Sequence, residues 1–325
     1  MKINHFALLM ITVCLFATGC GSNKAVTVSD FALNTYVSIT LYGKENEDIA
    51  KEALAKVKYY ENIFSKTKNG SQVCTLNTNG FIANCDTDLY DMVQKGLEFC
   101  EITDGNLDIT IGALTSLWDI TGTSPNVPSE EEITQALSHV NYKKVTCPAD
   151  NSIILENGMQ LDPGAIAKGF IADKICSFLY EKGITSGIIN LGGNILCIGQ
   201  KPDKSSYVVG IQKPFGDSDE IILSLDISGK SVVTSGTYER YFEENGKLYH
   251  HIIDPKTGYP ADSGLYSVTI ISDDSFTGDC LSTACLVMGK DNALKLINSL
   301  DGVYAILIDD RMNIYYSDGA RSFLH

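Results

Sequence analysis

The sequence predicts an α+β fold, with one compact domain of mixed, largely antiparallel sheets and packed helices. Strand-like and helix-like segments follow one another without the strict alternation of a doubly wound parallel sheet. The chain has 325 residues, 44% of them hydrophobic, which is enough to bury a sizeable core. Beyond residue 30, no stretch rich in Gly, Ser or Pro divides the chain. We therefore expect a single domain over residues 31–325.

The spacing of apolar residues locates the elements, with alternation indicating strands and three- or four-residue spacing indicating helices. Ser129 and Glu132 form a capping box that opens one helix, and Gly183 and Gly289 are typical helix ends. The expected helices cover residues 48–64, 89–100, a segment opening at 129, 163–181, 277–288 and 292–300. The expected strands cover residues 31–42, 144–147, 152–155, 184–191, 207–212, 221–227, 231–235, 248–253, 267–272, 303–308 and 314–316.

The N-terminus has the features of a signal peptide. Lys2 supplies a positive start, and residues 6–16 form an apolar run too short to span a bilayer as a mature helix. The run leads to Gly19-Cys20, which resembles a bacterial lipobox. We expect residues 1–19 to be the signal peptide, Cys20 to be lipidated and residues 20–30 to form a short tether. The protein would then lie at the extracytoplasmic face of the cell membrane.

The net charge of −15 argues against nucleic-acid binding, which relies on basic patches. An acidic protein also repels an anionic ligand unless lysines, helix termini or a metal cation reverse the local field. Any site for a phosphate-bearing ligand is therefore expected to include a cation. No cysteine pair has C-x-x-C spacing, which argues against a zinc ribbon or a thioredoxin-like motif.

The segment LDPGAIAKGF, residues 161–170, combines helix-start signals with a lysine. Asp162 suits the N-cap and Pro163 the first helical position, while Lys168 lies one turn further on. A helix N-terminus beside a positive charge attracts anions, so this segment predicts contact with a phosphate-bearing ligand. The alternative is a well-capped structural helix.

Two further clusters lie at junctions between expected elements. Gly192-Gly193, between Asn190 and Asn194, permits either an ordinary tight turn or close approach of the backbone to a ligand. His251 ends an apolar strand just before a turn and could move a proton near neutral pH, although a structural histidine is the alternative.

The helix expected over residues 277–288 carries Asp279 and Thr283 four positions apart, and therefore on one face. A carboxylate and a hydroxyl together suit magnesium, which takes few protein ligands and keeps water or phosphate oxygens. The alternative is an acid in the first turn that merely interacts favourably with the helix dipole.

These motifs occur in a fixed order: LDPGAIAKGF, INLGGN, TSGTYERYF, HIIDPKTG and DCLSTACLVMG. Further matches in the N-terminal half are residues 33–35, 64–65 and 106–112. The ordered set resembles the ApbE family, the FAD:protein FMN transferases, over nearly the whole mature chain. The resemblance implies an ApbE-like, T-fold-related domain that binds FAD and Mg²⁺ and attaches FMN to a threonine of a partner protein, releasing AMP.

The resemblance also implies roles for individual residues. His251 and Asp279 would be the catalytic residues. Magnesium would be held by the Ala165 carbonyl, Asp279 and Thr283, with Ser282 adjacent. The positions implied to contact or adjoin FAD are Leu33, Asn106, Leu107, Asp108, Asp162, Lys168, Gly192, Gly193, Asn194 and the Ile252 backbone.

The implied acceptors are extracytoplasmic subunits of quinone reductases, Rnf-type complexes or other flavin-carrying proteins. Two alternatives remain from the sequence: an FAD pyrophosphatase, with water in place of threonine, and a flavin-binding lipoprotein without turnover. The chain departs from the family pattern at Leu33-Asn34, where Met-Gly is common, and after Ser65, where an aromatic residue often follows. It also has Asp162-Pro163 where Asp-Leu is common.

Overall fold

The computed structural model describes residues 24–43, 46–217 and 219–325, and it confirms the α+β class. The helices are α1 (Glu47–Phe64), α2 (Gln72–Asn79), α3 (Thr87–Ile102), α4 (Gly112–Trp118), α5 (Glu130–Leu137), α6 (Ala167–Glu181), α7 (Ser275–Met288) and α8 (Lys290–Ile297). The strands are β1 (Ala25–Ala32), β2 (Thr35–Tyr42), β3 (Phe81–Ile82), β4 (Ile153–Ile154), β5 (Ser186–Leu191), β6 (Asn194–Gly199), β7 (Tyr207–Gln212), β8 (Ile221–Ile227), β9 (Ser231–Gly236), β10 (Tyr241–Glu244), β11 (Lys247–His250), β12 (Leu265–Ser272), β13 (Tyr304–Asp309) and β14 (Ile314–Tyr316).

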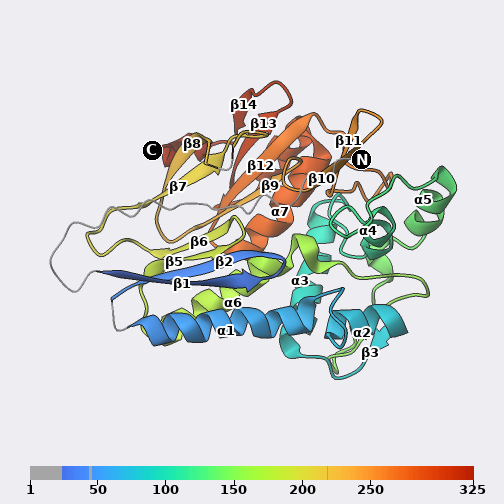
Figure 1. The fold of residues 1–325 in the computed structure, drawn as a ribbon, viewed down its shortest axis with the longest axis horizontal. Coiled ribbons are helices and arrows are strands. Elements are labelled where there is room, and N and C mark those ends of the chain that lie inside the picture. Colours follow the sequence, from blue (N-terminus) through green and yellow to red (C-terminus); the bar gives the residue numbers. More distant parts are fainter. Residues whose placement is uncertain (1–23, 44–45, 218) are drawn as a thin grey trace.

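An eight-stranded sheet forms the centre of the molecule, in the order β1-β2-β5-β6-β9-β12-β13-β14 (Figure 1). Every neighbouring pair in it is antiparallel. Helices α1 and α6 pack on β2, β5 and β6 around one apolar core, and α7 and α8 pack on β12 and β13 around another. The β7–β8 hairpin covers the opposite face with a third core. Both faces of the sheet are therefore buried, and successive residues of a strand contribute to opposite cores.

Most predicted elements are present within a few residues of their expected limits. The prediction was wrong over residues 31–42, which form the end of β1, a turn and β2 rather than one strand. Leu33 and Asn34 make this turn with φ values of 54° and 56°; asparagine is a common turn residue, whereas leucine is not. Strands β6 and β10 and the short helices α2 and α4 were not predicted.

The N-terminal boundary of the domain also differs from the prediction. Strand β1 begins at Ala25 and pairs with β2 along its whole length, so residues 25–30 belong to the sheet and not to a tether. The predicted signal peptide and Cys20 lie outside the described residues. Among the helices that the structure describes, none has the length and apolar character needed to cross a bilayer.

The helix predicted from residue 163 has two parts. Asp162 does act as an N-cap, with Oδ1 accepting the Gly164 N–H at 2.9 Å, but the segment it caps is a single 3₁₀ turn, Pro163–Ala165. Ile166 then leaves the helical region with φ −137°, and α6 begins at Ala167. This break turns the start of α6 toward α7.

Helices α6 and α7 pack unusually closely. A Cβ on Gly169 would lie 2.4 Å from the Ser275 carbonyl oxygen and 2.7 Å from the Phe276 Cα, so only glycine fits there. One turn further along α6, the Asp173 carboxylate accepts the Ser275 and Phe276 N–H groups at 2.7 and 2.9 Å. Asp173 thereby satisfies amides that the start of a helix leaves unpaired.

We predict that Gly169→Ala destabilises the protein by about 3 kcal/mol or more, the upper range for an overpacked core, because the methyl group meets backbone. Gly183→Ala is the control: a Cβ there meets no atom within 4 Å. It should cost only the left-handed backbone penalty of about 1–2 kcal/mol. The measurement is denaturant unfolding of both variants. Equal losses would contradict the proposed α6–α7 constraint.

Candidate functional site

The close packing of α6 and α7 brings the Asp279 carboxylate to the first turn of α6. Asp279 is buried, and its Oδ2 accepts the Gly169 N–H at 2.8 Å. The Lys168 Nζ lies 4.0 Å from the Asp279 Oδ1. In a continuous α-helix the Gly169 N–H would bond to the Ala165 carbonyl, four residues back. The bond to Asp279 therefore leaves the Ala165 carbonyl without its helical donor.

Hydroxyl groups cluster on the adjoining face of α7. The Ser235 Oγ on β9 lies 2.8 Å from the Ser282 Oγ and 3.2 Å from the Thr283 Oγ1. Ser282 also donates to the Asp279 carbonyl oxygen at 3.1 Å. Asp279 and Thr283 lie four positions apart on α7, and Ser235 contacts Thr283 from the sheet.

The available donors fit a hard cation. Burial raises the pKa of the Asp279 carboxyl, while the Lys168 ammonium and the Gly169 N–H oppose that rise, so a bound cation would favour the charged form. A carboxylate, a carbonyl lacking its helical donor and a hydroxyl are oxygen donors of the kind that magnesium prefers. No cluster of three or more His, Cys, Asp or Glu side chains suited to a metal occurs in the described ranges. A softer metal held mainly by side chains does not fit these donors.

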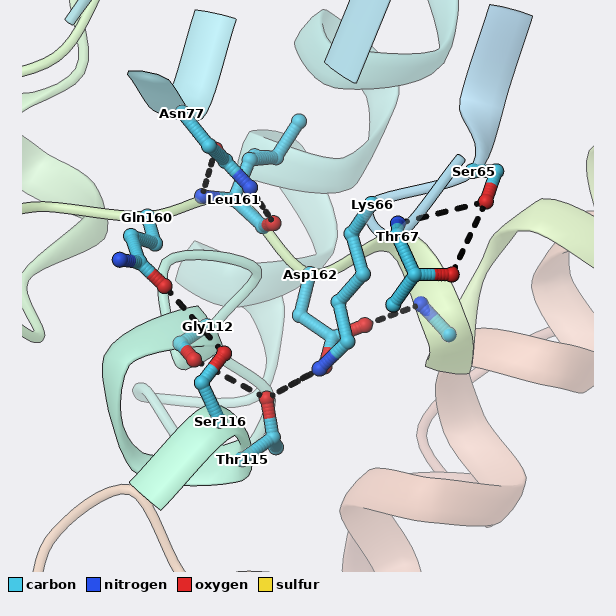
Figure 2. A network of polar contacts seen from close by, with 11 residues as sticks. Ser65, Lys66, Thr67, Asn77, Gly112, Thr115, Ser116, Gln160, Leu161 and Asp162 are labelled. Carbon is cyan, nitrogen blue, oxygen red and sulfur yellow. Dashed lines mark hydrogen bonds and ion pairs between the residues drawn. The ribbon is translucent and has the colours of Figure 1, made fainter. Parts of the chain in front are cut away.

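Asp162 lies in a different polar network from the one that its motif suggests. Figure 2 shows Lys66 and Thr115 converging on its carboxylate: the Lys66 Nζ and the Thr115 Oγ1 lie 2.7 and 2.6 Å from Oδ2. Burial alone would raise the pKa of the Asp162 carboxyl, but Lys66, Thr115 and the Gly164 N–H hold it below its usual range. The ammonium that pairs with Asp162 is therefore that of Lys66, while Lys168 lies beside Asp279.

The β1–β2 turn and the Gly192-Gly193 turn lie side by side. Gly192 has φ 65°, and a Cβ there would lie 2.3 Å from the Thr35 Oγ1. The Asn190 Oδ1 accepts the Gly193 N–H at 3.0 Å. Asn34 stands where the family commonly has the glycine of Met-Gly. Asparagine is the non-glycine residue that best tolerates the left-handed conformation found there.

Asn194, which follows this turn, is buried at the start of β6. Its Oδ1 accepts a hydrogen bond from the Ser275 hydroxyl. Its Nδ2 is buried and has no hydrogen-bond partner within the described part of the chain, yet it lies near enough to Asp279 to favour the charged form. An unpaired buried donor beside a carboxylate is suited to an oxygen atom of a ligand.

The adjacent histidines have different environments. The His250 Nε2 faces the Ala261 carbonyl at 2.9 Å and its Nδ1 accepts the Ile252 N–H at 3.3 Å, so both ring nitrogens are used. The His251 Nδ1 lies 3.2 Å from the Arg240 carbonyl oxygen. A carbonyl only accepts, so this contact assigns the proton to Nδ1 and leaves the Nε2 lone pair available.

Burial, assisted by the charge of Arg240, lowers the pKa of His251 to about 3. The ring is nevertheless partly exposed. Glu239 is exposed as well, yet burial raises the pKa of its carboxyl against the charges of Lys168 and Arg240. The charges of Lys168 and Arg240 thus act on both His251 and Glu239, so these four side chains form one electrostatic group.

The predicted site residues at 106–108 serve their own loop. The Asp108 carboxylate accepts hydrogen bonds from the backbone and hydroxyl of Thr110 and from the Tyr142 N–H. Asn106 donates to the Thr103 carbonyl at 2.7 Å, and the Leu107 N–H donates to the Thr103 hydroxyl at 3.1 Å. These bonds hold the loop rigid, and none of them joins it to Asp279.

The backbone of Ile252 is also engaged within the protein. Besides the N–H bond to His250, its carbonyl accepts the Ala261 N–H at 2.9 Å.

Sequence reasoning missed several residues of the site that contact or electrostatically affect a predicted one: Lys66, Thr115, Gly169, Ser235, Glu239 and Arg240. Gly169, Ser235, Glu239 and Arg240 lie inside motifs that were recognised, whereas Lys66 and Thr115 are linked to the site only by the fold.

We predict that Lys66→Met destabilises the protein at neutral pH by about 1.5–3 kcal/mol, the usual loss for a hydrogen bond to a charged group. Because the folded pKa of Asp162 is lowered, the stability it contributes is present above its unfolded pKa of about 4 and is lost as the pH falls through the folded value. The deficit of the variant should therefore shrink below about pH 4.

Urea unfolding at several pH values measures this deficit. Lys68→Met is the matched control, since Lys68 is an exposed lysine of the same loop and forms no ion pair with the residues that the structure describes. A deficit that is equal for the two variants, or one that stays constant with pH, would show that the Lys66–Asp162 pair contributes no specific stability.

Comparisons with known proteins agree with the motifs and the fold. The model of the ApbE family matches residues 33–307. FAD:protein FMN transferases from Klebsiella pneumoniae (strain 342) and Treponema pallidum (strain Nichols) are 33% and 32% identical to the chain, each over 92% of it and over 94% and 90% of their own lengths. The crystal structure of the ApbE protein from Thermotoga maritima superposes with a TM-score of 0.86 at 36% identity, covering 93% of this chain and all of that one. The extent of these matches shows that the chain belongs to the ApbE family and is a transferase.

Proposed function

We propose that the chain is a magnesium-dependent FAD:protein FMN transferase that attaches FMN to a threonine of an acceptor protein and releases AMP. The observation that carries this proposal is the meeting of Asp279, Lys168 and the Gly169 N–H where α6 approaches α7, which leaves the Ala165 carbonyl without its helical donor. The relatives from K. pneumoniae and T. pallidum bear the name of this activity.

The residues of the site divide into two groups with different tasks. Asp279, Thr283 and the Ala165 carbonyl, with Ser282 adjacent, would hold magnesium, which when bound neutralises charge on the pyrophosphate oxygens. Lys168 adds positive charge beside them. The unpaired Asn194 Nδ2 would donate to a ligand oxygen.

The proposed transfer exchanges the phosphoanhydride bond of FAD for a phosphoester bond to the acceptor. The threonine hydroxyl forms a new bond to the phosphorus on the FMN side, the bond to the bridging oxygen breaks, and AMP leaves with that oxygen. His251 accepts the hydroxyl proton at Nε2, because its Nδ1 is engaged by the Arg240 carbonyl. The main task of the protein is to position the reactants and to neutralise charge.

We also propose that Cys20 carries a lipid and that the domain acts at the extracytoplasmic face of the membrane. This proposal rests on the apolar run of residues 6–16 and the Gly19-Cys20 pair. It would bring the site to membrane-bound acceptors, such as subunits of quinone reductases or Rnf-type complexes.

Incubation with FAD and magnesium, with and without a threonine-bearing acceptor, tests the proposed activity. Covalently flavinylated acceptor together with AMP supports transfer. FMN and AMP formed equally fast without acceptor indicate a pyrophosphatase, and FAD that stays bound without either product indicates a flavin-binding protein. We expect Asp279→Asn to lower the transfer rate at least ~100-fold, as the loss of one electrostatic group in an active site does. Asp301→Asn, at an exposed position, is the control and should leave the rate unchanged.

A second prediction concerns His251. Since its pKa of about 3 lies well below the ordinary value, the ring is neutral throughout the range from pH 5 to 8 in the free protein. We expect kcat/KM to show no inflection near 6.5, the ordinary pKa of histidine. We expect His251→Ala to lower kcat ~100-fold or more and His325→Ala, at the exposed C-terminus, to have no effect. Full activity of His251→Ala at neutral pH would remove the proposed role.

A further inference from the structure

Arg240 contacts two parts of the site with its two ends. Its backbone carbonyl accepts the His251 N–H at 3.0 Å and lies 3.2 Å from the His251 Nδ1, so it holds both the backbone and the ring of the candidate base. Its guanidinium Nη2 donates to the Asn34 carbonyl at 3.2 Å. One residue therefore joins the β1–β2 turn to the histidine, although Asn34 and His251 are far apart in the sequence.

The turn that Arg240 holds is conformationally strained. Leu33 has φ 54°, a left-handed conformation that a bulky side chain rarely adopts. Such residues persist where the surroundings constrain them, and often where function uses the strain. The Glu61 Oε1 on α1 accepts the Leu33 N–H at 2.6 Å. The turn is thus held by Glu61 on one side and by Arg240 on the other.

Within the part of the chain that the structure describes, Arg240 forms no close ion pair with a carboxylate, although its charge acts on the Glu239 carboxyl. No Asp or Glu oxygen lies within ion-pair distance of Arg240 among residues 24–43, 46–217 and 219–325. The charged and titratable groups that affect His251 are Arg240, His250 and Lys168, and each lowers its pKa. A guanidinium has five N–H donors, and one contact to a carbonyl leaves most of them free.

We propose that Arg240 is a positioning residue that couples the β1–β2 turn to His251, so that the seating of the flavin substrate at the turn and the orientation of the base depend on one side chain. The proposal rests on the proposed function for the identity of the substrate. The coupling itself is a property of the free protein and can be measured without FAD.

The test perturbs the turn from its far side and observes the histidine. Glu61→Ala removes the acceptor for the Leu33 N–H without touching His251. Ring resonances of His251, assigned by their loss in His251→Ala, are recorded by NMR in four proteins: wild type, Glu61→Ala, Arg240→Gln and the double variant. We expect Glu61→Ala to shift the His251 resonances when Arg240 is present and to cause no further shift in the Arg240→Gln background.

Arg240→Lys serves as the conservative variant and Arg311→Gln as the control. Lysine can still donate to the Asn34 carbonyl, so Arg240→Lys should retain part of the response; it also decides the test if Arg240→Gln does not fold. Arg311 lies in the exposed β13–β14 turn, and Arg311→Gln should leave the His251 resonances unchanged. Two results would overturn the proposal. One is that Glu61→Ala leaves the His251 resonances unshifted, and the other is that it shifts them equally in the Arg240→Gln background.

Kinetics provide a second readout that a purely structural role would not produce. We expect Glu61→Ala to act mainly on the KM for FAD, and Arg240→Gln to lower kcat about 10- to 100-fold as well, as a misplaced catalytic group does. Wild-type kcat in a folded Arg240→Gln protein would overturn the proposal. Absence of transfer by the wild-type protein would overturn the proposed function alone, because the NMR coupling is measured without substrate.

Discussion

The contact of Gly169 with α7 is the constraint on which the rest of the site depends. With no side chain at Gly169, the two helices approach until a backbone N–H of α6 meets the Asp279 carboxylate. This single bond has two consequences. It fixes a buried acid at the start of α6, and it leaves the Ala165 carbonyl without its helical donor. The break at Ile166 makes this arrangement possible, because a continuous helix from Pro163 would have used that carbonyl internally.

The second requirement is a local positive field within a chain of net charge −15. Lys66 does not supply it, since its charge is neutralised by Asp162 at 2.7 Å. Lys168 is 4.0 Å from Asp279, and Arg240 forms no close ion pair in the described part of the chain, so these two cations supply positive charge around His251 and Glu239. The same two charges act on Glu239: burial raises the pKa of its carboxyl, and Lys168 and Arg240 both oppose that rise. The low pKa of His251 follows from the same surroundings: burial disfavours its cation, and Arg240 and Lys168 repel it.

The sequence predicted the fold class, most elements and the ordered motifs, because each of these depends on local periodicity or on spacing within a short segment. It failed where an interaction joins distant segments. The ion pair of Lys66 with Asp162 spans 96 positions, and no local pattern indicates it. The turn at Leu33-Asn34 was missed because leucine rarely adopts a positive φ, and its contacts to Glu61 and Arg240 come from distant parts of the chain. Gly169 was visible in its motif, but its role depends on the backbone of α7, which only the folded structure supplies.

Sheet register explains why residues so distant in sequence meet. Val37 of β2 pairs with Leu191 of β5, so the β1–β2 turn and the Gly192-Gly193 turn lie at the same end of the sheet. Strand β6 leaves that turn and pairs with β9 in the antiparallel sense, Ile195 with Val232, so β9 runs back toward the same end and delivers Arg240 just beyond it. The Arg240–Asn34 bond therefore joins neighbouring ends of strands across the central turn. Both residues of the Gly192-Gly193 turn have positive φ, and a Cβ on Gly192 would lie 2.3 Å from the Thr35 Oγ1 of the neighbouring turn. Gly192 of this turn thus has a specific reason to be glycine, because the strand order brings the β1–β2 turn against it.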